Sequence, residues 1–283
     1  MKFRIVVIIS LFLSACPAIA QDPNKITAVF NQKWLKSLVS IEICKDPNKP
    51  DPRGTGFLVI TPNNHIALVT AKHVVFDRQG KGSLIPNLGY RMNDKKERSS
   101  LILDNDVNSV VKSGWTRSEK FDVACRLIVR KDTTDFVTIP YSMFLPVKQL
   151  QAGAPLFIIG FPLGMRSEKY AIPVVRRAIV ARPDPNNIIV DGFVFPGNSG
   201  GPVVYEPTIQ FGEAFKTQIL QGDWFVGIVL SEISYVETAI SAQTLKPRVT
   251  FEDNSGLCNV LPADHILDLL ESPDFVGLDK SLK

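Results

Sequence analysis

One serine of the chain is surrounded by glycines in a way that suits nucleophilic chemistry. Ser199 lies in residues 195–203, where three glycines flank it. A serine hydroxyl needs an adjacent base, and it needs hydrogen-bond donors for the oxyanion that its attack generates. Glycines let the backbone turn tightly and bring amide N–H groups close to a substrate carbonyl. A glycine-rich loop with a chance serine is the alternative, and the Gly-Pro-Val sequence of residues 201–203 makes that alternative the weaker one.

A candidate base for this serine is His73. It follows the apolar, strand-like residues 68–71, and Ala71 beside it is small enough for the imidazole to lie against a packed wall. The chain has two other histidines, and a structural role suits both. His65 lies in a turn-like Pro-Asn-Asn-His sequence, and His265 falls in a predicted terminal helix.

A candidate partner for the base is Asp122, a single acidic residue at the head of residues 123–127, which are apolar except for Arg126. A charge at the edge of a core is costly unless it is paired and hydrogen-bonded. A carboxylate that orients an imidazole and stabilises the imidazolium is paired in this way. Taken alone, Asp122 also fits an acid at a strand edge facing water. The order His73, Asp122, Ser199 along the chain favours one site built from three segments.

The elements that must position these residues are mostly strands. Short segments rich in β-branched and aromatic residues are separated by Pro, Gly, Asn and Asp, which is typical of an all-β barrel or sandwich. One helix is predicted over residues 262–271, where Ile266, Leu269 and Leu270 form an apolar stripe that could dock on a barrel. The predicted strands are residues 38–44, 56–60, 66–70, 123–129, 155–159, 174–181, 188–190, 202–205 and 225–231.

The first twenty residues read as an export signal. Residues 1–4 carry positive charge, residues 5–13 are apolar, and small residues precede a cleavage point after Ala20. The apolar run is shorter than the ~20 residues that a membrane-spanning helix needs. Residues 13–16 also resemble the lipobox of bacterial lipoproteins, in which Cys16 would carry a lipid anchor. Both interpretations predict a periplasmic or extracellular protein with no membrane span, and cleavage at Ala20 is the one we favour.

Composition sets limits on partners and on cofactors. The 283 residues carry a formal charge of +4, and loss of Lys2 and Arg4 with the signal would leave +2. A net charge this close to zero, without clusters of Lys and Arg, gives no reason to expect nucleic acid as a partner. No Cys/His cluster has zinc spacing, so we expect neither metal nor cofactor. Three cysteines lie beyond the signal and cannot all pair within one chain, and buried free thiols are the favoured interpretation: Cys44, Cys125 and Cys258.

Three motifs together resemble the signatures of the chymotrypsin-fold, trypsin-like serine proteases. They are residues 70–73 (Thr-Ala-Lys-His), 122–124 (Asp-Val-Ala) and 197–202 (Gly-Asn-Ser-Gly-Gly-Pro). The sequence is most similar to the bacterial HtrA-type branch, because residues 54–59, 159–164 and 226–229 resemble strands of that branch as well. The resemblance runs from about residue 36 to residue 270.

The resemblance implies a fold and a set of roles. The fold is all-β, with two six-stranded antiparallel β-barrels, the active site between them and a C-terminal helix. We expect a signal peptide at residues 1–20, a first barrel at 21–145, a second at 146–261, and a helix and tail at 262–283. His73 is then the general base, Asp122 its orienter and Ser199 the nucleophile of a secreted endopeptidase that cleaves proteins or peptides. The N–H groups of Gly197 and Ser199 form the oxyanion hole.

The chain departs from the family pattern in several places. Asn198 stands where animal digestive enzymes have an aspartate that pairs with a freed N-terminus, so activation by that ion pair is not implied. Val74 replaces a cysteine, and Lys72 replaces a small residue, with a side chain that we expect to project outward. After the predicted helix about a dozen residues remain, fewer than the ~50 of a further domain, so we expect no PDZ domain.

Three uncharged residues are candidates for the pocket that would select the substrate. By resemblance, the primary pocket lies near Phe193, with Leu230 and Gly256 as walls. None of the three is charged, which favours a small or apolar residue before the cleaved bond, and Glu232 at the rim could modify this preference. A catalytically inactive, binding protein of the same fold is the alternative function. An esterase is less favoured, because residues 202–204 read as a strand where the elbow of an α/β-hydrolase needs a helix.

Overall fold

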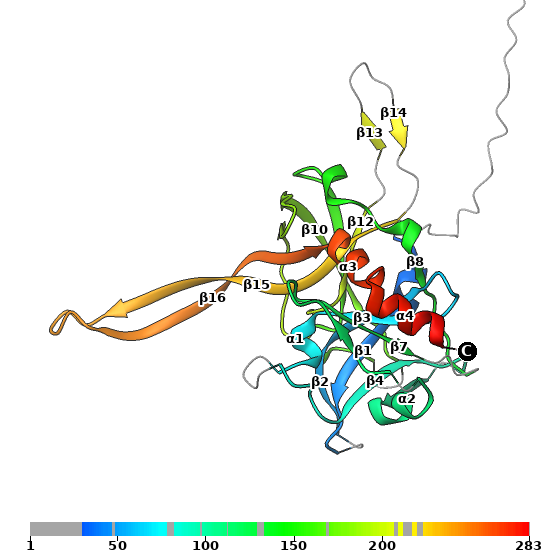
Figure 1. Cartoon of the computed structure of the whole chain (residues 1–283). Helices are drawn as coiled ribbons and strands as arrows, with labels where there is room; N and C mark the ends of the chain where they lie inside the picture. The colour runs from blue at the N-terminus through cyan, green and yellow to red at the C-terminus, as the bar shows by residue number, and fades with distance from the viewer. Residues whose placement is uncertain are drawn as a thin grey trace, which may run out of the picture.

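The computed structural model describes residues 30–282 except residues 47–48, 78–81, 97, 112, 129–132, 168–169, 207–208, 212–216 and 220–222. The predicted signal peptide and Cys16 therefore lie outside the described residues. Strands dominate, and they form two large β-sheets, one in each half of the chain (Figure 1). The predicted all-β class is confirmed.

The first sheet has eight strands. Seven run in the order β5-β4-β1-β2-β3-β7-β6, and β8 pairs in parallel with β2. The predicted strands of this half overlap β1, the second half of β2, β3 and β7, whereas β4, β5, β6 and β8 were not predicted. The bounds are β1 (Leu38–Ile43), β2 (Asp51–Ile60), β3 (Ile66–Thr70), β4 (Leu88–Asn93), β5 (Ser99–Leu103), β6 (Thr116–Arg117), β7 (Ala124–Ile128) and β8 (Ile139–Pro140).

Among the described residues the strand order of this sheet is open, whereas a closed six-stranded barrel was predicted. Helix α2 (Asp104–Val111) follows β5 directly, and β6 has only two residues, so β5 and β6 are the ends of the sheet among the described residues. A cluster of buried polar side chains lies between α2 and the sheet. Arg126 on β7 is almost fully buried and bonds Asp104 at the start of α2, together with Tyr90 on β4. The Asp104 carboxylate that α2 supplies pairs the buried Arg126, whose charge would otherwise be costly to bury.

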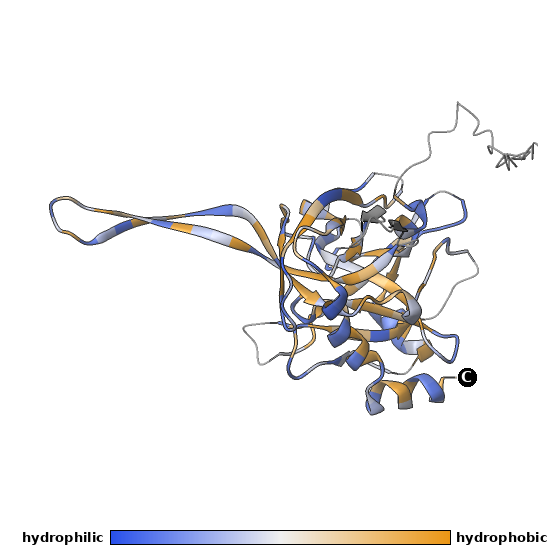
Figure 2. Cartoon of the chain, turned by 90° about the horizontal axis from the view of Figure 1, so that it is seen from above, coloured by the Kyte–Doolittle hydropathy of each residue, from blue (hydrophilic) through white to orange (hydrophobic). Residues whose placement is uncertain are grey.

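The second sheet is a closed barrel of six strands, as predicted. The strands follow one another in the order β10-β11-β16-β15-β12-β9. Strands β15 and β16 continue far beyond the barrel as a projecting two-stranded ribbon (Figures 1 and 2). A separate hairpin, β13 with β14, lies between β12 and β15. The bounds are β9 (Pro155–Gly160), β10 (Val174–Arg182), β11 (Ile188–Asp191), β12 (Pro202–Tyr205), β13 (Ile209–Phe211), β14 (Thr217–Ile219), β15 (Trp224–Ile240) and β16 (Pro247–Pro262).

Two helices end the chain. Helix α3 (Ala263–Leu270) is the predicted terminal helix, and its apolar stripe of Ile266, Leu269 and Leu270 is buried. A second helix, α4 (Pro273–Ser281), lies where we predicted only a tail. Ser272 caps it by accepting a hydrogen bond from the Phe275 N–H. The remaining helical turns are short: α1 (Lys72–Val75), η1 (Gln32–Ser37), η2 (Tyr141–Met143), η3 (Val147–Gln149) and η4 (Pro162–Gly164).

The two sheets pack against each other through aromatic side chains. Phe225 of β15 lies 4.8 Å from Phe57 of β2 and 4.7 Å from Phe144, measured between ring centroids. Burial of such rings contributes roughly 2–3 kcal/mol each. Thr55 of β2 adds hydrogen bonds across the same boundary, to residues of the loop that carries Ser199. The packing therefore holds the ends of several strands from both halves in one place.

Candidate active site

His73 and Asp122 come together on the first sheet. His73 sits on α1, directly after β3, and Asp122 precedes β7, which pairs with β3. The Asp122 carboxylate accepts from the His73 backbone N–H at 2.9 Å and contacts Nδ1 of the same ring at 2.7 Å. Both side chains are half-buried. A carboxylate that bonds Nδ1 fixes the proton there, which leaves Nε2 free to accept a proton.

The loop that carries Asp122 is held by the residue next to the histidine. Lys72 Nζ donates to the Ser118 carbonyl at 2.7 Å, and the Ser118 hydroxyl accepts from the Phe121 N–H at 3.1 Å. The Ser118 N–H in turn donates to the Val123 carbonyl. Lys72 thus ties α1 to the turn before Asp122, a contact that the expected outward projection of its side chain did not include.

Ser199 lies in a tight turn between β11 and β12 that only glycine permits. Gly197 has φ +99°, and a Cβ placed there would lie 2.3 Å from the Phe161 carbonyl oxygen. Gly200 has φ +80°, and its Cβ would lie 2.2 Å from the Thr55 carbonyl oxygen. Backbone atoms on both sides therefore require glycine at these two positions.

Two peptide planes of this turn are oriented by hydrogen bonds to their carbonyls. The Pro196 carbonyl accepts from the Leu163 N–H at 2.6 Å, and the Asn198 carbonyl accepts from the Gly201 N–H at 2.8 Å. In a planar trans peptide the N–H points opposite to the C=O. The N–H groups of Gly197 and Ser199 therefore point away from these partners, and both residues line one pocket.

Asn198, between these two peptides, is buried and bonds within its own turn. Its Oδ1 accepts from the Phe195 N–H at 3.0 Å, and its backbone N–H donates to the Phe195 carbonyl at 2.9 Å. The Asn198 side chain therefore accepts a hydrogen bond from its own turn, which stabilises the loop before Ser199.

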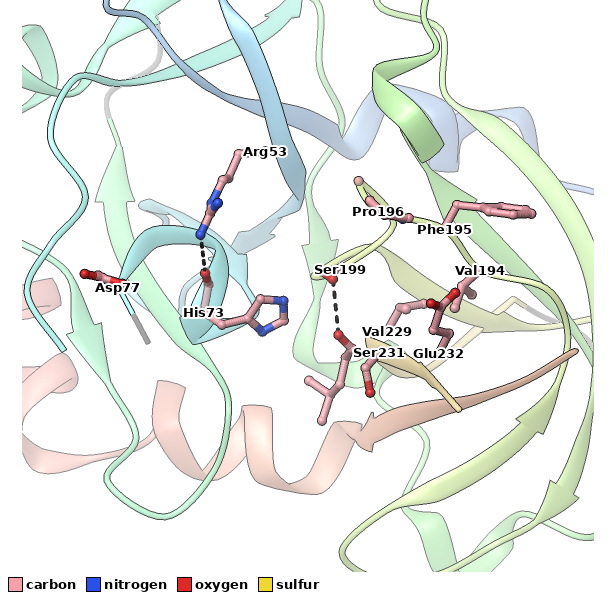
Figure 3. Close-up of a pocket in the computed structure, with 12 residues that line it drawn as sticks. Arg53, His73, Asp77, Val194, Phe195, Pro196, Ser199, Val229, Ser231 and Glu232 are labelled. Carbon is pink, nitrogen blue, oxygen red and sulfur yellow. Dashed lines mark hydrogen bonds between the residues drawn. The ribbon is translucent and has the colours of Figure 1, made fainter. Parts of the chain in front are cut away.

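One pocket of about 580 Å³ brings His73 and Ser199 together. Figure 3 shows the imidazole of His73 on one side and Ser199 across from it. The Ser199 hydroxyl donates to the Leu230 carbonyl at 3.1 Å rather than to the histidine. The structure thus hydrogen-bonds two of the three predicted side chains to each other and sets the third in the same pocket.

One of the predicted specificity residues, Leu230, lines the pocket. The ring of Phe193 lies against Gly256, about 3.4 Å from where a Cβ of residue 256 would be. Glu232, expected at the rim, also lines the pocket. Sequence reasoning did not assign several other lining residues, which come from segments far apart in the chain: Arg53, Asp77, Val194, Phe195, Pro196 and Ser231.

Asn254 on β16 organises this wall. Its amide nitrogen donates to the Glu232 carboxylate at 2.8 Å and to the Val194 carbonyl at 2.7 Å. Its Oδ1 accepts from the Gly256 N–H at 2.9 Å. The Glu232 carboxylate is thereby held beside the otherwise apolar residues that precede Gly197.

The other histidines lie outside this pocket. His65 Nδ1 contacts the buried carboxylate of Asp279 at 2.9 Å, and Thr61 and Asn63 donate to the same group. These hydrogen bonds lower the pKa of Asp279 against the opposing effect of burial. His265 stacks on Phe121, with ring centroids 3.7 Å apart.

The three described cysteines are free and buried, as favoured from the sequence: Cys44, Cys125 and Cys258. Burial raises the pKa of all three thiols, that of Cys258 to about 12, so none carries an appreciable thiolate at neutral pH. Within the described part of the chain no group of three or more His, Cys, Asp or Glu could hold a metal ion.

Comparison with known families gives one match, to the trypsin-like peptidase domain, over residues 54–207. The match covers more than half of the chain and includes His73, Asp122 and Ser199. No curated protein sequence is similar enough to match the chain.

Solved structures share the fold at low identity. Human heparin binding protein is 12% identical, with a TM-score of 0.53 over 86% of this chain and 95% of that chain. An HtrA-type protease, AlgW with a tripeptide, is 15% identical, with a TM-score of 0.47 over 85% of this chain. The match spans 60% of the AlgW chain. Deg5 is 17% identical, with a TM-score of 0.47 over 83% of this chain and 88% of that chain. The similarity to the human protein supports a chymotrypsin-like fold.

Proposed function

The chain belongs to the trypsin-like peptidase family, and we propose that it is a serine endopeptidase that works through His73, Asp122 and Ser199. The observation that carries the proposal is the contact between His73 Nδ1 and Asp122 at 2.7 Å on the side of the pocket opposite Ser199. An imidazole oriented in this way, across a pocket from a serine in a glycine turn, suits acyl transfer to that serine.

The first step requires a rotation of one side chain. Ser199 Oγ leaves the Leu230 carbonyl and turns towards Nε2 of His73, which takes its proton as the hydroxyl attacks a peptide carbonyl. Catalytic hydrogen bonds are often long or misaligned in the absence of substrate and tighten in the complex. The freed Leu230 carbonyl can then accept an N–H group of the bound peptide.

The developing oxyanion is proposed to lie against the N–H groups of Gly197 and Ser199. The fixed carbonyls of Pro196 and Asn198 support this assignment, since they hold both N–H groups away from their own partners. Loss of one such donor typically costs 10²–10³-fold in kcat. His73 then protonates the leaving amine, and water repeats the sequence on the acyl-enzyme.

A fluorophosphonate probe tests this proposal. We expect one equivalent of label on Ser199, lost in Ser199→Ala and reduced by orders of magnitude in His73→Ala. Ser231→Ala is the matched control, because Ser231 lines the same pocket and should not alter labelling. Absence of label in a folded wild-type chain would refute the proposal.

A binding protein of the same fold is the second candidate. The observation in its favour is the Ser199–Leu230 hydrogen bond, which engages the nucleophile with the strand that would receive substrate. Peptide binding with no labelling, at unchanged thermal stability, would support this candidate. The esterase interpretation is not proposed, because the strand β12 begins at Pro202 where an α/β-hydrolase needs a helix.

We also propose that the protein is exported, either by cleavage after Ala20 or as a lipoprotein anchored at Cys16. The charge, apolar run and small residues of the first twenty positions support export. None of the described helices is long and apolar enough to cross a membrane. Mass spectrometry of the mature N-terminus from the native host would distinguish Gln21 from a lipidated Cys16.

A further inference from the structure

The ribbon formed by β15 and β16 beyond the barrel is unsupported along both edges. From Ser234 to Ile240, β15 pairs only with residues 247–254 of β16, and no other described strand pairs with either. We call this part, residues 234–254, the arm (Figures 1 and 2). An isolated two-stranded hairpin is at best marginally stable in water. An exposed strand edge also invites pairing with another chain.

The arm exposes large apolar side chains along its length. Each is more than half exposed, up to 80% for Leu245. Surface residues of this size gathered on one element are typical of an interaction site. The members of this set are Tyr235, Val236, Ile240, Leu245, Val249 and Phe251.

On the β16 side of the arm the charges are divided between the two ends, and Glu237 on β15 lies between them, opposite Phe251. Lys246 and Arg248 lie near the tip, and Glu252 and Asp253 lie towards the barrel. Arg248 falls in a register shift and has no partner on β15, and Glu252 lies opposite Val236. Neither Arg248 nor Glu252 has an ion-pair partner among the described residues. The arm therefore holds unpaired positive charge at one end and unpaired negative charge at the other.

We propose that two copies of the chain pair antiparallel along the free edge of β16, with a two-fold axis through Thr250. In this register Arg248 lies opposite Glu252 of the partner subunit, and Val249 lies opposite Phe251 of the partner subunit. The two-fold axis repeats both pairs, so one register matches two ion pairs and two apolar pairs. Self-complementary surfaces of this kind are what a two-fold dimer requires.

Strand β15 does not offer an equivalent match. It carries Glu232 and Glu237 and no lysine or arginine over its whole length. Pairing through β16 also leaves the pocket side of β15 unobstructed, where Leu230 and Glu232 line the pocket. Because antiparallel arms place each tip beside the partner's arm base, the partner's tip would lie near the pocket rim. The dimer would thus extend the surface next to each active site.

Analytical ultracentrifugation of the purified protein tests the proposal by charge exchange. We expect a dimer whose dissociation constant rises about ten- to thirtyfold in Arg248→Glu and in Glu252→Arg, since each change replaces two cross-strand attractions by repulsions. The double variant Arg248→Glu/Glu252→Arg restores the complementary pairs and should return to within a few-fold of wild type. Replacing residues 236–252 by an Asn-Gly turn, which joins the paired residues Tyr235 and Asp253, should give a monomer.

Three outcomes would overturn the inference. The first is a wild-type chain that stays monomeric at high micromolar concentration. The second is a dimer that survives removal of the arm or is unaffected by both single reversals, because its interface would lie elsewhere. The third is protection of the arm from hydrogen exchange only when a peptide is bound to the Ser199→Ala variant. The arm would then contact substrate and not a second copy of the chain. Melting temperatures of all variants separate loss of association from loss of folding.

Discussion

Thr55 links the first sheet to the loop that carries Ser199, and we expect it to fix the position of that loop. It is fully buried, and its hydroxyl donates to the Gly197 carbonyl at 2.7 Å and accepts from the Phe161 N–H at 3.0 Å. The Gly197 carbonyl belongs to the peptide between the two that supply the proposed oxyanion donors. We predict that Thr55→Val, which keeps the shape and removes the hydroxyl, lowers both stability and the reactivity of Ser199.

The magnitude follows from two buried backbone groups that lose their partner. A buried donor or acceptor left unsatisfied costs about 1–3 kcal/mol, so the loss of two partners in Thr55→Val should cost about 2–6 kcal/mol. For a domain of this size about 3 kcal/mol lowers Tm by roughly 6–12 °C. If a quarter to a half of that free energy comes from weaker positioning of the loop that carries Ser199, labelling of Ser199 slows by roughly three- to tenfold. Thr55→Ser is the matched control, because it keeps the hydroxyl and removes only a methyl group, at about 1 kcal/mol.

Two measurements decide this prediction. Urea unfolding gives the free energy of each variant, and the rate of fluorophosphonate labelling per folded molecule gives the reactivity. Equal stability of Thr55→Val and Thr55→Ser, within about 0.5 kcal/mol, would show that these hydrogen bonds are not the source of the coupling. A stability loss with unchanged labelling would show that Thr55 supports the fold and not the loop.

Three more predictions rest on the same structure. Ser199→Ala and His73→Ala should each lower kcat by roughly 10⁴-fold or more, and the double variant little further, because the groups act as a unit; additive losses in peptide hydrolysis would contradict this. Asp279→Asn should cost about 2–3 kcal/mol at pH 7. Since the folded pKa of Asp279 is lowered, that stabilisation is present above the ordinary carboxyl value of 3.8 and is lost as pH falls through the folded value, so thermal melts of variant and wild type should converge in acid. Arg126→Met should cost about 3–5 kcal/mol by leaving Asp104 buried without its cation, and Arg126→Met/Asp104→Leu should recover much of it; a single variant within about 1 kcal/mol of wild type in urea unfolding would refute the pairing.

The sequence alone determined the fold class and the choice of candidate residues, because both depend on local patterns. Alternation and turn residues mark strands wherever the chain goes, and positions such as Gly197 and Gly200 carry a backbone requirement that a short motif records. The segments around His73, Asp122 and Ser199 are each recognisable within a few residues. The apolar stripe of the terminal helix is equally local and correctly indicated α3.

The tertiary structure decided which side chains meet across long sequence separations. The packing of the Phe193 ring against Gly256 joins two segments far apart in the sequence, and the orientation of Glu232 depends on Asn254 from another strand. The buried Arg126 meets Asp104 and Asn108 of α2, and no local sequence pattern predicts that pairing. The arm was not predicted, since the last predicted strand ended at residue 231, and a strand's alternation does not say whether a neighbour covers its edge. These features arise from long-range contacts, whose energies are set by the packed environment and not by the residues next to them in the chain.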